Sequence, residues 1–215
     1  MRNFYSWLKT KRNQFLETQY VAPKVLWITG MGSTGVGARE LASMGYEVKQ
    51  VGTTTNRYAA YLGWLNQFQP MHSFFGKSVK DLGQDHLQKN VSKHDSEMKD
   101  SEFVPDVVVG TSQGGALVMQ VAHNYPHSKF VLGAPAWNIF GADPSTLPRD
   151  TIVIHGMKDK QVLPRDSFAL KDRFGYELRT YDFGHTIPTD VIKDAVDTQL
   201  KRMGITVPKT NPMVN

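Results

Sequence analysis

Pro105-Asp106-Val107-Val108-Val109-Gly110-Thr111-Ser112-Gln113-Gly114 is a strand-like run that ends in a G-x-S-x-G pattern, and a helix-like run over residues 115–125 follows at once. A serine on such a sharp strand-to-helix turn has a strained backbone, and its neighbours must lack side chains that would collide with the helix. The turn also directs the amide of Gln113 toward the place where an oxyanion would form, at the positive end of the helix dipole. The stretch therefore predicts a nucleophile, Ser112, and one donor of an oxyanion hole, Gln113.

The two other residues that such a serine requires follow later strands. Residues 151–156 form a continuous apolar run, typical of a strand buried on both faces, and Asp159 comes shortly after it. Residues 176–183 predict one more strand, which is followed by His185. Serine, acid and histidine, each placed just after a strand, is the chain order of a hydrolase triad. We therefore predict Ser112, Asp159 and His185 as catalytic residues.

Two other acids lie near the same loops and compete with Asp159. Asp166 is expected to begin a helix, where a carboxylate interacts favourably with the dipole, and Asp182 is expected within the last strand. Asp159 alone directly follows the end of its strand, which makes it the preferred acid. The place of His185 after a strand favours a catalytic role over that of an ordinary surface histidine.

The chain resembles the compact, lidless serine hydrolases of the α/β-hydrolase superfamily, the group that includes acyl-protein thioesterase-like carboxylesterases and dienelactone hydrolase-like proteins. The resemblance covers about residues 25–200 and implies an α/β fold of three layers, with a mostly parallel sheet of about six strands, helices on both faces and no lid domain. Thr29 and Thr111 depart from the family pattern, at positions that concern substrate fit and loop geometry. The resemblance rests on four segments: Thr29-Gly30-Met31-Gly32-Ser33-Thr34-Gly35, Gly110-Thr111-Ser112-Gln113-Gly114-Gly115-Ala116, His155-Gly156-Met157-Lys158-Asp159-Lys160-Gln161-Val162-Leu163-Pro164 and Gly184-His185.

The resemblance also implies the reaction, which is the hydrolysis of a carboxylic ester or thioester through an acyl-enzyme. His185 would take the proton of Ser112, and Asp159 would orient the imidazole. The tetrahedral oxyanion would be held by the amide of Gln113 and, by resemblance, by that of Met31 in the loop after the first core strand. Neither a cofactor nor a metal ion is expected.

Another enzyme class fits part of the sequence. Residues 30–35 match G-x-G-x-x-G between a strand and a helix, as dinucleotide binding requires, and Tyr125 and Lys129 form Y-x-x-x-K downstream of Ser112. This combination is typical of NADP-dependent short-chain dehydrogenases. In those enzymes the tyrosine and the lysine share one helix, whereas Pro126 interrupts the helix here. The other alternative is a non-catalytic binding protein with the same fold, which the sequence leaves open.

Length and composition predict one soluble domain. The chain has 215 residues, 40% of them hydrophobic, and no apolar run approaches the roughly 20 residues that a membrane span requires. It has no cysteine, hence neither a disulfide nor a thiolate metal site, and its N-terminus lacks the apolar segment of a signal peptide. We expect a cytoplasmic enzyme with an N-terminal helical extension over residues 1–24, an α/β-hydrolase domain over residues 25–204 and a loose C-terminal tail over residues 205–215.

The net charge of +5 gives no reason to expect nucleic acid as a partner. Residues 25–199 hold 17 basic and 19 acidic side chains, so the excess of positive charge lies in the two terminal segments. The body of the chain lacks the basic surface that a phosphate backbone requires. The basic N-terminal segment either lies on a membrane surface as an amphipathic helix or packs against the domain edge, as such segments more often do.

The substrate is the part of the function that the sequence defines least. Trp137, Phe74 and Phe75 are candidates to line a pocket for a small-molecule ester or thioester, although such aromatic residues equally form buried packing. Residues 52–104 predict a helix, an irregular insert around Phe74 and Phe75 and, over residues 84–102, a second and mostly exposed helix. The sequence does not define the oligomeric state.

Overall fold

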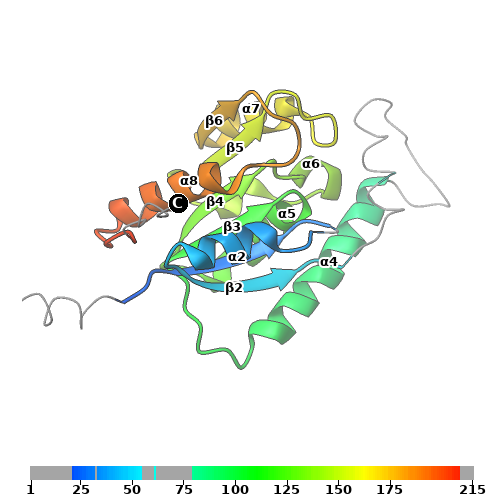
Figure 1. The fold of residues 1–215 in the computed structure, drawn as a ribbon. Coiled ribbons are helices and arrows are strands. Elements are labelled where there is room, and N and C mark those ends of the chain that lie inside the picture. The colour runs from blue at the N-terminus through cyan, green and yellow to red at the C-terminus, as the bar shows by residue number, and fades with distance from the viewer. Residues whose placement is uncertain (1–20, 32, 55–60, 62–78, 209–215) are drawn as a thin grey trace, which may run out of the picture.

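A parallel β-sheet runs through the centre of the molecule (Figure 1). The computed structural model describes residues 21–31, 33–54, 61 and 79–208. The strands are β1 (Lys24–Thr29), β2 (Glu47–Gly52), β3 (Val107–Thr111), β4 (Lys129–Gly133), β5 (Ile152–Gly156) and β6 (Glu177–Tyr181). Within the described residues their order is β2-β1-β3-β4-β5-β6, and each neighbouring pair is parallel. The predicted sheet of about six mostly parallel strands is confirmed.

Both faces of the sheet are buried, which explains the continuous apolar runs of its central strands. Leu26 and Ile28 of β1 belong to the hydrophobic cluster on one face, and Val25 and Trp27 belong to the cluster on the other. Successive side chains of a strand point to opposite faces, so a strand that is covered on both sides needs apolar residues at nearly every position. The residues of β3 and β5 divide between the two clusters in the same way.

Helices cover the two faces as separate layers (Figure 1). The described helices are α2 (Val36–Ser43), α4 (Val79–Met98), α5 (Gln113–Val121), α6 (Trp137–Phe140), α7 (Pro164–Phe174) and α8 (Thr189–Arg202), with short 3-10 helices η1 (Ala122–Asn124) and η2 (Pro144–Thr146). Apolar residues of α2 and α8 pack on the face of Val25 and Trp27. Those of α4, α5, α6 and α7 pack on the face of Leu26 and Ile28. This arrangement of helices, sheet and helices confirms the three predicted layers.

Helix α4 is the mostly exposed helix that the sequence predicts over residues 84–102, although it begins and ends a few residues earlier. One of its sides is buried, and polar residues supply much of this side: His86, Asn90 and His94 are 5%, 1% and 1% exposed, beside Leu87. The spacing of four residues places the three polar side chains along one face of the helix. What the sequence does not predict is the buried side, because a buried helix face is expected to be apolar, and this one instead buries polar groups that are hydrogen-bonded.

The strand order changes direction beside β1, and this position determines where a site can form. From β1 the chain passes to β2 on one side and then to β3 on the other side. At such a switch point, loops at the carboxyl ends of the two strands leave in opposite directions and open a crevice. The loop after β1 and the turn after β3 border this crevice, and Met31 and Ser112 line the same cavity there.

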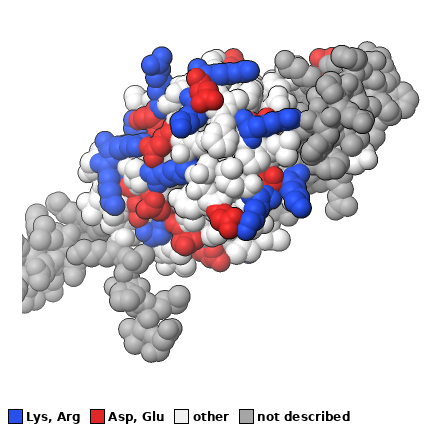
Figure 2. Space-filling view, turned by 90° about the horizontal axis from the view of Figure 1, so that it is seen from above, with Lys and Arg blue, Asp and Glu red and all other residues white. Residues whose placement is uncertain are grey.

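The described surface carries charges of both signs. On the face seen in Figure 2, Lys and Arg lie among Asp and Glu. The ion pairs of the described residues include those of Arg179 with Glu177 and with Asp194. No helix among the described residues combines the length and the apolar character that crossing a lipid bilayer requires. Ile205 and Val207, in the predicted tail, pack against the cluster that α2 and α8 share. Of the predicted N-terminal extension, residues 1–20 lie outside the described residues.

Candidate active site

The turn between β3 and α5 holds Ser112 in a backbone conformation that residues with side chains rarely adopt, with φ 53° and ψ −120°. The Ser112 N–H donates to the carbonyl oxygen of Gly133 at 2.8 Å, and the Ser112 carbonyl accepts from the amides of Gly115 and Ala136, both at 3.0 Å. These bonds tie the turn to β4 and α5, so the surrounding structure maintains the strained conformation. The turn has the geometry of the nucleophile elbow that the G-x-S-x-G pattern predicts.

Close packing around the elbow depends on glycine. A Cβ atom at Gly114 would lie 2.2 Å from the carbonyl oxygen of Ile28 in β1. A Cβ atom at Gly30, directly after β1, would lie 2.9 Å from the Cβ of Ser112. The Gly30 amide also donates to Thr111 Oγ1 at 3.3 Å. The loop after β1 and the elbow are therefore held side by side at the crevice.

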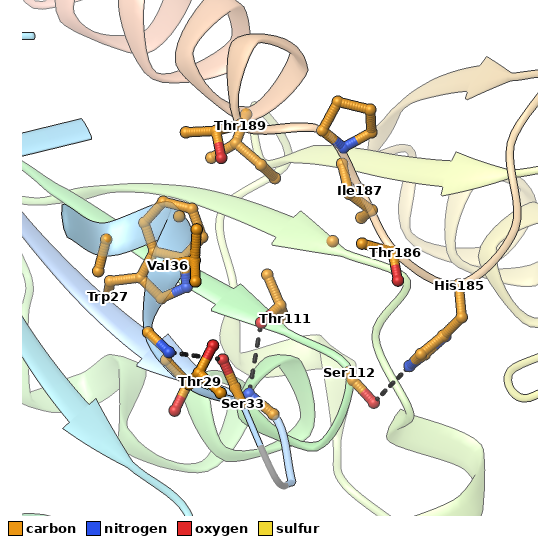
Figure 3. Close-up of a pocket in the computed structure, with 18 of the residues that line it drawn as sticks. Trp27, Thr29, Ser33, Val36, Thr111, Ser112, His185, Thr186, Ile187 and Thr189 are labelled. Carbon is orange, nitrogen blue, oxygen red and sulfur yellow. Dashed lines mark hydrogen bonds between the residues drawn. The ribbon is translucent and has the colours of Figure 1, made fainter. Parts of the chain in front are cut away.

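Ser112, His185 and Asp159 form a hydrogen-bonded chain beyond the carboxyl ends of β3, β6 and β5. His185 Nε2 lies 3.1 Å from Ser112 Oγ, and His185 Nδ1 lies 2.7 Å from Asp159 Oδ2. Figure 3 shows the imidazole turned toward the serine hydroxyl. Because a carboxylate only accepts hydrogen bonds, Nδ1 carries the hydrogen and Nε2 is free to take the serine proton. The structure thus brings together the three residues that the sequence predicts as catalytic.

Asp159 is buried, and hydrogen-bond donors surround its carboxylate. Oδ1 accepts from the amides of Gln161 and Val162, at 2.8 and 3.1 Å. Burial alone would raise the pKa of Asp159, but the hydrogen bonds from His155 and His185 and the charge of His185 hold that pKa well below its usual range. The carboxylate is therefore ionised at neutral pH and can stabilise positive charge on His185.

Two cavities meet at Ser112 and His185. The larger, of about 640 Å³, lies between the loop after β1 and the start of α8 (Figure 3). The smaller, of about 370 Å³, lies beside α6. Hydroxyl groups recur in the wall of the larger one, which we call the hydroxyl-lined cavity: Thr29, Ser33, Thr34, Thr111, Thr186 and Thr189. Aliphatic and aromatic residues dominate the described wall of the smaller one, which we call the apolar cavity: Ala136, Ile139, Phe140 and Val162.

The two residues predicted to supply an oxyanion hole both lie at Ser112. Gln113 is the first residue of α5, so its N–H has no carbonyl partner within the helix and lies at the positive end of the helix dipole. Met31 follows β1 and lines both the hydroxyl-lined and the apolar cavity together with Ser112. Both predicted residues therefore border the nucleophile, one after the end of β1 and the other at the start of α5.

A buried network that the sequence does not predict anchors the side chain of Gln113 to α4. Gln113 Nε2 and Asn90 Nδ2 lie 2.7 and 3.3 Å from His86 Nε2. The Thr54 amide donates to Asn90 Oδ1 at 2.6 Å, which fixes the orientation of the Asn90 amide, so Asn90 Nδ2 donates and His86 Nε2 accepts. Burial lowers the pKa of His86, which keeps the ring neutral as this role requires.

No protein-family model matches the sequence, and no curated protein matches it either. Solved structures are similar to it in three dimensions. Est1E from Butyrivibrio proteoclasticus is 14% identical with a TM-score of 0.57, over 85% of this chain and 89% of that one. An α/β serine hydrolase without a lid from Xanthomonas campestris is 16% identical with a TM-score of 0.53, over 90% and 87%. MGS-MChE2, an α/β-hydrolase enzyme from a lagoon sediment metagenome, is 12% identical with a TM-score of 0.56, over 86% and 93%. The chain has the α/β-hydrolase fold.

Within this α/β-hydrolase fold, the aromatic residues predicted to line a substrate pocket are placed elsewhere or lie outside the described residues. Trp137 is on α6, where its indole N–H donates to the carbonyl oxygen of Asp166 at 3.1 Å and its ring packs against the core. The described residues that line the two cavities do not include Trp137. Phe74 and Phe75 lie outside the described residues.

The competing acids do not contact His185 in the described structure. Asp166 is in the first turn of α7, and Asp182 pairs at the surface with Lys158 at 2.8 Å. Every residue between Ser112 and His185 is described, and these residues form strands, helices and loops of the three layers without a separate lid domain.

The arrangement of a short-chain dehydrogenase is not formed. Lys129 is the first residue of β4, whereas Ser112 follows the last residue of β3. Because β3 and β4 are parallel, Lys129 lies at the amino ends of these strands and Ser112 lies beyond their carboxyl ends. Tyr125 precedes β4, and its hydroxyl is 2.8 Å from His94 Nε2 of α4. The Y-x-x-x-K pattern thus arises from residues that do not share a helix and do not face the crevice.

Proposed function

We propose that the protein is a serine hydrolase that cleaves a carboxylic ester or thioester through an acyl-enzyme. The observation that carries this proposal is the hydrogen-bonded chain from Ser112 Oγ through His185 to Asp159. A serine hydroxyl holds its proton too tightly to attack a carbonyl carbon at neutral pH, and a base within hydrogen-bond distance removes this obstacle. The strained elbow and the helix dipole behind it support the same chemistry.

The reaction proceeds in two halves that share one proton path. Ser112 Oγ attacks the carbonyl carbon while its proton passes to His185 Nε2. The bond to the leaving alcohol or thiol then breaks, and His185 returns the proton to the leaving group. Water next attacks the acyl-enzyme by the same path, which releases the carboxylic acid and the free serine. Asp159 remains ionised and stabilises the imidazolium in both halves.

The amides of Met31 and Gln113 stabilise the negative charge that develops on the carbonyl oxygen. Loss of one such donor typically lowers turnover by about 10²- to 10³-fold. Gln113 is well suited to this role because its side chain is fixed to His86 of α4. Its backbone N–H therefore needs no rearrangement when the charge develops, which is the condition under which such donors are most effective.

The two cavities support a small-molecule substrate with unlike halves. Ser112 lies where they meet, so the bond to be cleaved lies between a part of the substrate in the apolar cavity and a part in the hydroxyl-lined cavity. The apolar cavity, at about 370 Å³, is near the lower end of the range for small-molecule sites, which favours a compact apolar group. The hydroxyl-lined cavity offers donors and acceptors to a polar group.

Labelling with a fluorophosphonate, followed by mass mapping of the modified peptide, tests the proposal. We expect covalent modification of Ser112, and no modification in Ser112→Ala or His185→Ala. Hydrolysis of p-nitrophenyl acetate falls by about 10⁶-fold in Ser112→Ala. Ser128→Ala is the control, because Ser128 donates to the carbonyl of Pro105, away from the crevice. Native protein that resists the label, or hydrolysis that survives Ser112→Ala, contradicts the proposal.

A further inference from the structure

His155, on β5, contacts the acid of the triad, and the mechanism above does not use it. The residue is fully buried. Its Nε2 lies 3.0 Å from the carbonyl oxygen of Val162 and 3.4 Å from Asp159 Oδ2, and its Nδ1 lies 2.6 Å from Ser167 Oγ. A second histidine therefore reaches the same carboxylate oxygen that accepts from His185.

The partners of His155 determine which ring nitrogen carries its hydrogen. The Val162 carbonyl and the Asp159 carboxylate can only accept, so Nε2 is the donor. In the neutral ring, Nδ1 is then an acceptor, and the Ser167 hydroxyl donates to it. Ser167 is fully buried in α7, so this helix holds the imidazole from one end while the loop of Asp159 and Val162 receives its N–H at the other.

His155 adds a fourth N–H group beside the carboxylate. Oδ1 accepts from the amides of Gln161 and Val162, and Oδ2 accepts from His185. The Nε2–H of His155, which donates to the Val162 carbonyl at 3.0 Å, also lies near Oδ2, with Nε2 at 3.4 Å. A carboxylate has about four lone-pair sites, and each oxygen here faces two N–H groups, of which that of His155 is shared with the Val162 carbonyl. With both oxygens held, the carboxylate cannot rotate away from His185 without breaking hydrogen bonds in a dry environment, where unmade bonds are costly.

We propose that His155 is a positioning residue, whose Nε2–H fixes Asp159 so that Oδ2 receives the Nδ1–H of His185. The proposal rests on the function proposed above. Core packing alone does not require this residue, because the other side chains of the strand, Ile152, Val153 and Ile154, are all aliphatic. The other acid near His155 is Asp166 of α7, whose carboxylate accepts instead from Asn138 at 3.3 Å.

Steady-state kinetics of p-nitrophenyl acetate hydrolysis over a range of pH test the proposal. In His155→Leu we expect kcat to fall about 10- to 100-fold, the size of a lost hydrogen bond to a charged group, with little change in KM. The acidic limb of the kcat/KM profile moves to lower pH, because a carboxylate that is no longer held against His185 stabilises the imidazolium less. His155→Gln retains an N–H near the Nε2 position and restores most of kcat.

A measurement that does not depend on turnover separates this proposal from the proposed function. In ¹⁵N-labelled protein, the hydrogen-bonded Nδ1–H of His185 gives a low-field proton resonance, which we expect to shift or broaden in His155→Leu and to return in His155→Gln. Gln199→Met is the control for a lost buried polar group. Gln199 is fully buried and donates to the carbonyls of Phe130 and Asp150, which lie at the amino ends of β4 and β5, away from the site.

Three results would contradict the positioning role of His155. An unchanged resonance in His155→Leu, an unchanged pH profile, or a loss of kcat that Gln199→Met reproduces overturns the positioning role, even if Ser112 labels as expected. If His155→Leu does not fold, Ser167→Ala removes only the partner of Nδ1 and leaves the ring in place. A smaller shift of the same resonance in Ser167→Ala supports the proposal, and its absence contradicts it.

Discussion

Gly114 shows how a single atom decides whether the elbow can form. The backbone of this residue lies against β1 so closely that a Cβ would approach the carbonyl oxygen of Ile28 to 2.2 Å. The obstacle is backbone rather than the end of a flexible side chain, so relief requires a shift of α5 or of β1. Either shift moves the Ser112 hydroxyl relative to His185.

We therefore expect Gly114→Ala to lower the free energy of unfolding by about 1–3 kcal/mol through overpacking and to reduce kcat. Gly52→Ala is the matched control, because the atom nearest to its added Cβ is Thr29 Oγ1 at 3.9 Å. The control variant changes stability by less than about 0.5 kcal/mol. Urea unfolding of the two variants measures the difference, and equal midpoints would show that α5 does not press against β1 as described.

At the residue scale, the sequence predicts those site residues whose role depends on local chain geometry. Ser112, Gln113, Asp159 and His185 each follow the end of a strand, and a strand end is visible in the sequence. His155 gives no such signal. It stands within an apolar run, and its partners, Ser167 and Val162, reach it only through tertiary contacts. The positioning role proposed for His155 could therefore not be predicted from the sequence alone.

Helix α4 shows the corresponding limit at the scale of elements. The presence of the helix follows from the polar, Pro-free run of sequence, although it lies a few residues earlier than predicted. Its buried side does not follow, because His86, Asn90 and His94 lack the apolar pattern of a core-facing helix. The partners that make their burial tolerable, Gln113 and Tyr125, belong to α5 and to the turn before β4. A polar face of a helix can be predicted to be buried only when the residues that form hydrogen bonds with it are also known.

The neutral ring of His86 gives α4 a measurable dependence on pH. Because burial lowers the pKa of His86 below 6.5, the unfolded chain takes up a proton as the pH falls through that value while the native state does not. This contribution to stability is fully present above the unfolded pKa and is lost as the pH falls toward the folded pKa. In His86→Leu we expect lower stability at neutral pH, since Gln113 and Asn90 lose their acceptor, but a weaker loss below about pH 6.5.

Urea unfolding between about pH 8 and about pH 5 measures this difference. His123→Leu is the control, because His123 is exposed in η1, and this variant retains the slope of the native protein. Identical slopes for the native protein and His86→Leu would mean that His86 is not held neutral by burial.

At the scale of the whole molecule, the sheet separates two hydrophobic cores. Ile28 belongs to the cluster beneath α5, and Ile154 belongs to the cluster beneath α8; both are fully buried, and β3 and β4 lie between their strands. The sequence predicts this division correctly, because an uninterrupted apolar run already requires cover on both faces of a strand.

We expect Ile28→Val and Ile154→Val each to cost about 0.5–1.5 kcal/mol, and the double variant to cost their sum within about 0.5 kcal/mol. Leu132 and Val153 are the contrasting pair, because they face each other across β4 and β5 in one cluster, and their double variant departs from additivity. Urea unfolding of the singles and doubles measures both cases. Strong coupling between Ile28 and Ile154 would show that the two cores are not independent.

The described sheet contains only parallel pairs, so each adjacent pair of strands is linked by a crossover instead of a tight hairpin. Hydroxyl, carboxylate and imidazole come from beyond three different strands, which no short peptide fragment of this chain holds together. In an unfolded or partly synthesised chain, the hydroxyl of Ser112 thus has no base within hydrogen-bond distance. The reactivity proposed for this serine therefore depends on the complete tertiary structure.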